Sequence, residues 1–117
     1  MARRDLTGAV DFAVLERMTA GDAAIAEEVL GLFAQQAAMW EPMLDVREDG
    51  WRDAAHTLRG AAAGIGAEPL AEACASAETA DKAMAPALLD RVRDALEAAL
   101  ADVAAYRHEL MLQGLRG

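Results

Sequence analysis

The sequence has little that could cross-link the chain, anchor it in a membrane or direct it out of the cell. Its single cysteine, Cys74, cannot form an intramolecular disulfide, so a reducing compartment is expected. No stretch approaches the ~20 consecutive apolar residues of a membrane span. The basic start over residues 1–5 is not followed by the apolar run of a signal peptide. We therefore expect a cytoplasmic protein with no membrane contact.

Basic residues are scarce as well. Lys and Arg number 11 against 20 Asp and Glu, which gives a net charge of -9. Binding to nucleic acid or to an anionic membrane requires clustered Lys and Arg, so neither partner is expected. The two histidines, His56 and His108, are far apart in the sequence, and no Glu-x-x-His pairing exists. The sequence therefore predicts no metal site and no cofactor, and the lack of a glycine-rich nucleotide loop argues against a kinase.

Signals for β-strands are missing. Aromatic residues make up only 4% of the chain, and no run alternates with period two or is rich in β-branched residues. Hydrophobic residues make up 55% and charged residues 26%, which is typical of a globular protein. Alanine supplies much of the apolar share, which favours helices. The length fits one domain, so we predict a single all-α domain over 1–117.

Capping and turn residues divide the chain into five predicted helices. Their approximate bounds are 11–19, 22–47 (ended by the loop 48–50), 51–64, 69–79 and from 86 onward. The second helix carries apolar residues at helical spacing, namely Ile25, Leu30, Phe33, Ala37, Trp40 and Leu44. The last helix has the most regular stripe: Leu89, Val92, Leu96, Ala99, Val103, Tyr106 and Leu110. These patterns predict an antiparallel four-helix bundle with a short additional N-terminal helix as a lid.

The third predicted helix places a histidine on its outer face. With Leu58 at the centre of the apolar stripe, His56 lies about 160° away, because successive residues are about 100° apart. Arg59 and Gly60 share this outer half. Glycine within a helix costs about 1 kcal/mol relative to alanine, so folding alone does not favour Gly60 there. We expect that another molecule approaches the backbone closely beside His56.

The residue types on this face suit phosphoryl chemistry. A neutral imidazole has a lone pair on one nitrogen and can act as a nucleophile towards phosphorus. Arg52 and Arg59 bring positive charge near the ring, although we interpret Arg52 as an ordinary surface charge. A group on a facing helix could hold the other ring nitrogen's proton and fix the tautomer.

The segment that begins at His56 resembles a known family, the histidine-containing phosphotransfer (HPt) domains. The run from His56 to Gly66 follows their pattern of histidine, any residue, aliphatic, Lys or Arg, glycine, small residues and glycine. The signature segment is 51–80, and it contains further matches at Trp51, Leu70, Cys74 and Glu78. Phe33 and Gly50, upstream of the segment, also fit the family. The pattern departs from the family at two positions, with arginine where lysine is commoner and Ala61 where serine is frequent.

The resemblance implies a role for each residue of the motif. His56 would be the phosphoacceptor, Arg59 the cation that stabilises the phosphate, and Gly60 the access residue. Glu78 would accept a hydrogen bond from the ring, although it could equally be a solvated charge, and Gly60 could be a helix-packing glycine. Cys74 is interpreted as a core residue and His108 as inert.

The resemblance also implies partners and the limits of the activity. We expect response-regulator receiver domains and a hybrid histidine kinase as partners of a monomeric carrier that does not hydrolyse ATP. Magnesium would be held only by the receiver domain. The alternative is a helical adaptor or dimerisation module that binds a receiver or a kinase without carrying phosphate.

Overall fold

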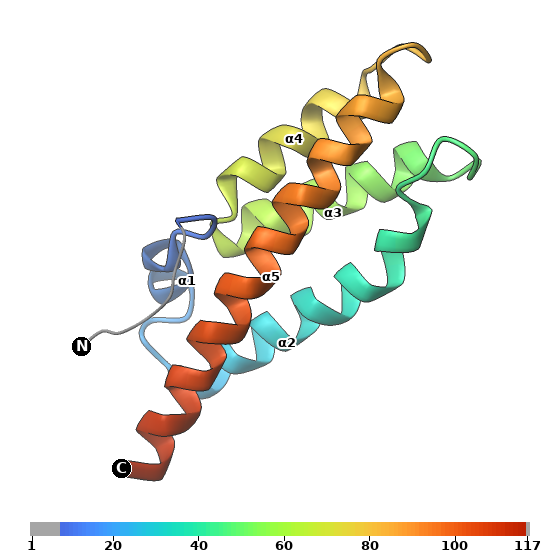
Figure 1. Ribbon diagram of the computed structural model, residues 1–117. Coiled ribbons are helices and arrows are strands. Elements are labelled where there is room, and N and C mark those ends of the chain that lie inside the picture. Colours follow the sequence, from blue (N-terminus) through green and yellow to red (C-terminus); the bar gives the residue numbers. More distant parts are fainter. Residues whose placement is uncertain (1–7, 117) are drawn as a thin grey trace.

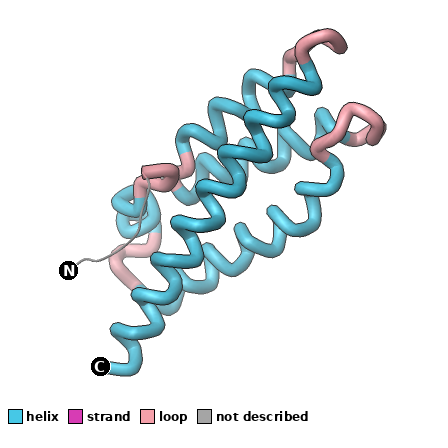
Figure 2. The backbone as a smooth tube through the Cα atoms, in the orientation of Figure 1, coloured by secondary structure: helices cyan, strands magenta, loops and turns pink. Residues whose placement is uncertain are grey.

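The computed structural model describes residues 8–116, so the basic start over residues 1–5 lies outside the described part. The described residues contain helices and no strands (Figures 1 and 2). The elements are α1 (Phe12–Met18), α2 (Ala23–Trp40), the 3₁₀ helix η1 (Glu41–Met43), α3 (Trp51–Ile65), α4 (Glu68–Glu78) and α5 (Ala85–Arg116). The prediction of an all-α fold is confirmed.

The four longer helices form a bundle. Helices α3 and α4 pack against each other, α5 packs against α4 and α2, and α2 packs against α3. The short helix α1 lies at the end of α3, as expected of a lid, and α5 runs along the whole length of the bundle (Figure 1). This arrangement leaves the outer faces of α3 and α4 side by side.

The apolar stripes predicted for α5 and α3 form much of the core. In α5, every member of the stripe from Leu89 to Tyr106 is at most 6% exposed, and Leu110 packs against the cluster from its edge. In α3 the buried residues are Trp51, Ala54, Ala55, Leu58, Ala62 and Ile65. The short alanine side chains allow neighbouring helices to approach closely, because the distance between helix axes depends on the side chains at the contact.

Helix α2 is shorter than predicted, and one residue of its predicted stripe is not buried. It ends at Trp40 rather than at the loop 48–50, because Pro42 has no N–H to continue the helical hydrogen bonds. At its start, the Asp22 side chain accepts a hydrogen bond from the Ile25 N–H, as expected of an N-cap. Ile25 itself is 46% exposed, and the neighbouring Ala26 takes its place in the core. The stripe predicted for this helix was therefore wrong at Ile25.

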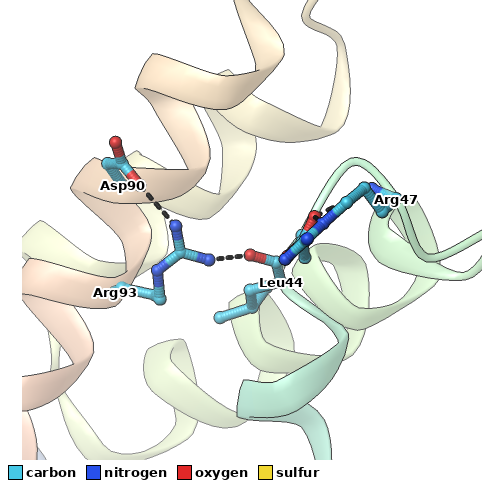
Figure 3. Close-up of polar contacts among 5 residues, drawn as sticks. Leu44, Arg47, Asp90 and Arg93 are labelled. Atoms are coloured by element: carbon cyan, nitrogen blue, oxygen red, sulfur yellow. Dashed lines mark hydrogen bonds and ion pairs between the residues drawn. The ribbon is translucent and has the colours of Figure 1, made fainter.

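The segment after α2 is held by the last helix. Arg93 of α5 donates hydrogen bonds to the Leu44 carbonyl and to the Asp90 carboxylate (Figure 3). Leu44 is fully buried although it lies beyond the helix. The periodic spacing thus identified Leu44 correctly as a core residue, while the backbone reaches the core by a different path.

Helix α3 continues through Gly64 to Ile65, one residue beyond its predicted end near 64. Gly66 is the C-cap, with a φ of 82° in the left-handed region that favours glycine. A Cβ at this position would lie 2.4 Å from the Asp11 carbonyl oxygen. The Asp11 N–H donates to the Gly66 carbonyl at 2.8 Å. Gly66 therefore both ends α3 and seats the start of α1.

Gly66→Ala is expected to lower the free energy of unfolding by about 2–4 kcal/mol, because alanine meets both a strained φ and a backbone oxygen. Gly64→Ala is the matched control, since a Cβ at Gly64 would meet no described atom within 4 Å. The control should be neutral or stabilising by up to ~1 kcal/mol. Urea denaturation of both variants measures the difference, and equal stabilities would contradict this account of the α3 C-terminus.

A buried carboxylate secures the segment before α1, which the sequence analysis did not anticipate. Asp102 of α5 is fully buried and accepts hydrogen bonds from the Ala9 and Val10 N–H groups at 3.0 and 3.3 Å. These bonds satisfy a charge that would otherwise be costly to bury. They hold the chain that leads into α1 against the middle of α5.

None of the helices in the described part of the chain is long and apolar enough to cross a membrane.

Candidate functional site

His56 lies in the middle of α3 and its side chain is 64% exposed. This exposure agrees with the helical wheel, which placed it opposite Leu58. Its ring is nevertheless held by a neighbouring helix, because His56 Nδ1 lies 2.7 Å from Oε1 of Glu78. Glu78 is the last residue of α4, and its side chain is only 19% exposed. The close packing of α3 against α4 thus brings together two residues that are distant in the sequence.

This contact selects one tautomer of the imidazole. A carboxylate can only accept a hydrogen bond, so Nδ1 must carry the hydrogen that Glu78 receives. In the neutral ring, Nε2 then holds the lone pair. The arrangement therefore presents a nucleophilic nitrogen on an exposed side chain, while the other nitrogen is fixed by the protein.

Arg59 completes the cluster from the next turn of α3. Its Nε lies 2.9 Å from Oε2 of Glu78, so the carboxylate bridges the histidine and the arginine. Arg59 Nη2 lies 3.4 Å from His56 Nδ1, but Nδ1 already donates to the carboxylate at a shorter distance and cannot also accept. The Arg59 side chain is 45% exposed, so its remaining N–H groups can donate to an anion.

The surface beyond His56 along α3 carries very little side chain. Gly60 is exposed, and a Cβ built on it would meet no atom of the described residues within 4 Å. Ala63 is exposed on the following turn. The other interpretation was that Gly60 packs against a neighbouring helix. The described part of the chain gives no support for this packing. This flat face would let a second molecule approach the ring.

Arg52 is exposed at the surface, as the sequence suggested, but its side chain has specific partners. Its Nη1 donates to the Glu78 carbonyl at 2.6 Å and its Nη2 to the Ala80 carbonyl at 2.8 Å. The guanidinium carbon lies 4.3 Å from the centroid of the Trp51 ring. The side chain therefore binds the C-terminal end of α4, which the sequence analysis did not anticipate.

The other reactive residues do not join this cluster. Cys74 is buried, and its burial, together with the nearby charge of Glu78, raises the pKa of the thiol to about 12. The thiol therefore stays protonated near neutral pH and is a poor nucleophile. His108 is exposed on α5, beyond the Arg107–Glu27 ion pair. Within residues 8–116, no group of three or more His, Cys, Asp or Glu side chains could hold a metal ion.

Comparison with known proteins identifies the family to which this chain belongs. The Hpt domain model matches residues 26–102, a range that includes His56, Arg59, Gly60 and Glu78. The crystal structure of histidine phosphotransferase ShpA from Caulobacter crescentus is similar, with a TM-score of 0.82 and 54% sequence identity over 92% of this chain and 99% of that chain. Among curated protein sequences, none matches. The chain therefore belongs to the Hpt domain family and is a histidine phosphotransfer protein of a phosphorelay, a phosphocarrier rather than a kinase.

Proposed function

We propose that His56 is the phosphoacceptor and that it carries a phosphoryl group between the aspartates of receiver domains. The observation that carries this proposal is the 2.7 Å contact between His56 Nδ1 and Glu78 Oε1 on an otherwise exposed ring. This contact leaves the lone pair on Nε2, the nitrogen that the protein does not hold. A purely adaptor role has no use for such a nucleophile, although the adaptor alternative remains an outcome of the experiments below.

The transfer step follows from this tautomer. Nε2 attacks the phosphorus of an aspartyl phosphate, so an Nε2–P bond forms while the bond from phosphorus to the carboxylate oxygen breaks. The aspartate leaves with the bonding electron pair, and the Nδ1 hydrogen stays in place. Positive charge develops on the ring as Nε2 loses its lone pair, and the Glu78 carboxylate stabilises that charge. Transfer to a second receiver is the same step in reverse.

Arg59 and Gly60 serve the incoming phosphoryl group in this proposal. The exposed N–H groups of Arg59 can donate to the phosphoryl oxygens, which are anionic throughout the transfer. The bare surface at Gly60 lets the receiver bring its phosphoaspartate within bonding distance of Nε2. Glu78 has a second task, because its charge holds Arg59 beside the ring.

The partners follow from the same chemistry. We propose response-regulator receiver domains and a hybrid histidine kinase as donors and acceptors, with Mg²⁺ bound by the receiver domain. The protein itself would need no cofactor and would act as a monomer. A cytoplasmic location is part of the proposal, since Cys74 is a free thiol and the reaction partners are intracellular signalling domains.

Incubation with a phosphorylated receiver domain and Mg²⁺ tests the proposal. The protein should acquire a phosphate that is labile in acid and stable in base, as expected of a phosphoramidate. Incubation with radiolabelled ATP alone should give no labelling. Binding of the phosphorylated receiver without any transfer would instead identify the protein as an adaptor, and stoichiometric labelling from ATP would identify a kinase.

The rate of phosphoryl transfer should depend more on the charge at position 59 than on the shape of the side chain. Arg59→Lys is expected to keep the rate of transfer within about tenfold of wild type, because lysine keeps the positive charge. Arg59→Glu should slow transfer by about 100-fold or more, since it repels both the phosphoryl group and Glu78. Single-turnover transfer from a phosphorylated receiver measures both rates. Equal activity in all three proteins would show that Arg59 is only a surface charge.

A further inference from the structure

Arg52 contacts the residue that holds the His56 ring, but it does so through the backbone. Its Nη1 donates to the carbonyl of Glu78 at 2.6 Å, and its Nη2 donates to the carbonyl of Ala80 at 2.8 Å. The last carbonyls of a helix have no partner within the helix, and a cation is favoured at this negative end of the helix dipole. Arg52 therefore caps the C-terminus of α4.

The position of Glu78 makes this cap relevant to the site. A terminal helical residue has few backbone hydrogen bonds of its own and frays readily. The Glu78 carboxylate is nevertheless held at hydrogen-bonding distance from both His56 and Arg59. Its backbone is bound from α3 by Arg52, and its side chain is bound from α3 by Arg59. One helix thus holds this residue at two points.

We propose that Arg52 is a positioning residue for phosphoryl transfer, which keeps Glu78 in contact with His56 Nδ1 and so keeps the lone pair on Nε2. The proposal rests on the assignment of His56 as phosphoacceptor. It gives the two arginines separate tasks: Arg59 faces the phosphoryl group, while both terminal nitrogens of Arg52 are occupied by backbone carbonyls. The Trp51 ring beside the guanidinium helps to hold it in this orientation.

The tautomer of His56 gives a direct measurement that requires no transfer. Two-dimensional ¹H–¹⁵N spectra of the imidazole distinguish the Nδ1–H form from the Nε2–H form. Wild-type protein should show His56 mainly as the Nδ1–H form. Arg52→Met, which keeps an unbranched stem over Trp51, should shift the ring towards the Nε2–H form. Arg52→Gln should shift it in the same direction and serves as a second variant should the first fold poorly.

The matched control is Arg107→Met. Arg107 also bridges two helices, since its Nε donates to Glu27 at 2.7 Å, but it lies on α5 away from His56. This variant should lose stability and leave the His56 spectrum unchanged. Arg52→Lys, which keeps the charge and can reach one carbonyl, should retain most of the Nδ1–H form.

Transfer kinetics then show whether Arg52 acts through Glu78. Arg52→Met should slow single-turnover transfer by about tenfold, within the ~100-fold that a misplaced group can cost. In a Glu78→Ala background the same substitution should cause no further loss. An unchanged tautomer in both Arg52→Met and Arg52→Gln would overturn the proposal, as would a full additional loss in the Glu78→Ala background. If wild-type His56 accepted no phosphoryl group, the proposed function would fail, while the spectra would still decide the role of Arg52.

Discussion

His56→Gln is expected to reduce phosphoryl transfer by at least ~1,000-fold, to the background of the assay. Glutamine is polar and of similar size, but its amide nitrogen has no lone pair that can attack phosphorus. The side chain is 64% exposed in the wild type, so the variant should fold normally. Labelling from a radiolabelled phosphoreceiver, with circular dichroism as a check on folding, measures the effect.

His108→Gln is the control for this variant. His108 is exposed on α5 beside Arg107 and Glu109, so its loss tests whether any accessible imidazole on this protein is sufficient. We expect full labelling in His108→Gln. Labelling that survives in His56→Gln and disappears in His108→Gln would overturn the assignment of the phosphoacceptor.

Gly60→Gln is expected to separate transfer from folding. A Cβ at this position would meet no atom of the described residues within 4 Å, and Gly60 is exposed, so the variant should fold with stability unchanged or raised. The glutamine would nonetheless lie one turn from His56, on the surface that the receiver would approach in the proposed transfer. We expect transfer to slow by about 100-fold, because a displacement of about 1 Å in the reacting groups can have that effect.

Gly60→Ala supplies the comparison for this prediction. Alanine should raise the free energy of unfolding by up to about 1 kcal/mol, since it is the better helix former at an exposed site, and should slow transfer far less than glutamine does. Melting temperature and single-turnover rate are measured together for both variants. Lost stability combined with unimpaired transfer would show that Gly60 packs within the bundle and that the docking surface lies elsewhere.

The parts of the fold that the sequence predicted are those in which a single periodic pattern fixes the structure. The stripe of α5 is long and regular, and its members are buried as expected. The end of α2 was missed because the burial of Leu44 continues the apolar spacing past Pro42, where the helix stops. The end of α3 was predicted one residue early, because Gly64 signals a helix end in the sequence just as Gly66 does. Gly66 differs from Gly64 in its left-handed φ and in its contact with Asp11, which is distant in the sequence.

In the candidate site, too, some features could be predicted from the sequence and others could not. The outward position of His56 and the open surface at Gly60 follow from the rotation of successive residues about one helix, so they could be predicted. The contact of Glu78 with the ring depends on how α3 and α4 are aligned, and the sequence left it undecided. The role of Arg52 could not be predicted at all, because its acceptors are backbone carbonyls at the end of another helix. Every residue has a backbone carbonyl, so the residue types in a sequence do not indicate which carbonyl accepts a hydrogen bond.

In the proposed mechanism Glu78 holds Nδ1 of His56, so that Nε2 receives the phosphoryl group. The most direct test is to phosphorylate the ¹⁵N-histidine-labelled protein with a receiver domain and to identify the phosphorylated nitrogen by ³¹P and ¹⁵N NMR. We expect one phosphoryl group, on Nε2 of His56, with the hydrogen retained on Nδ1. A phosphoryl group on Nδ1, or on any residue other than His56, would contradict it.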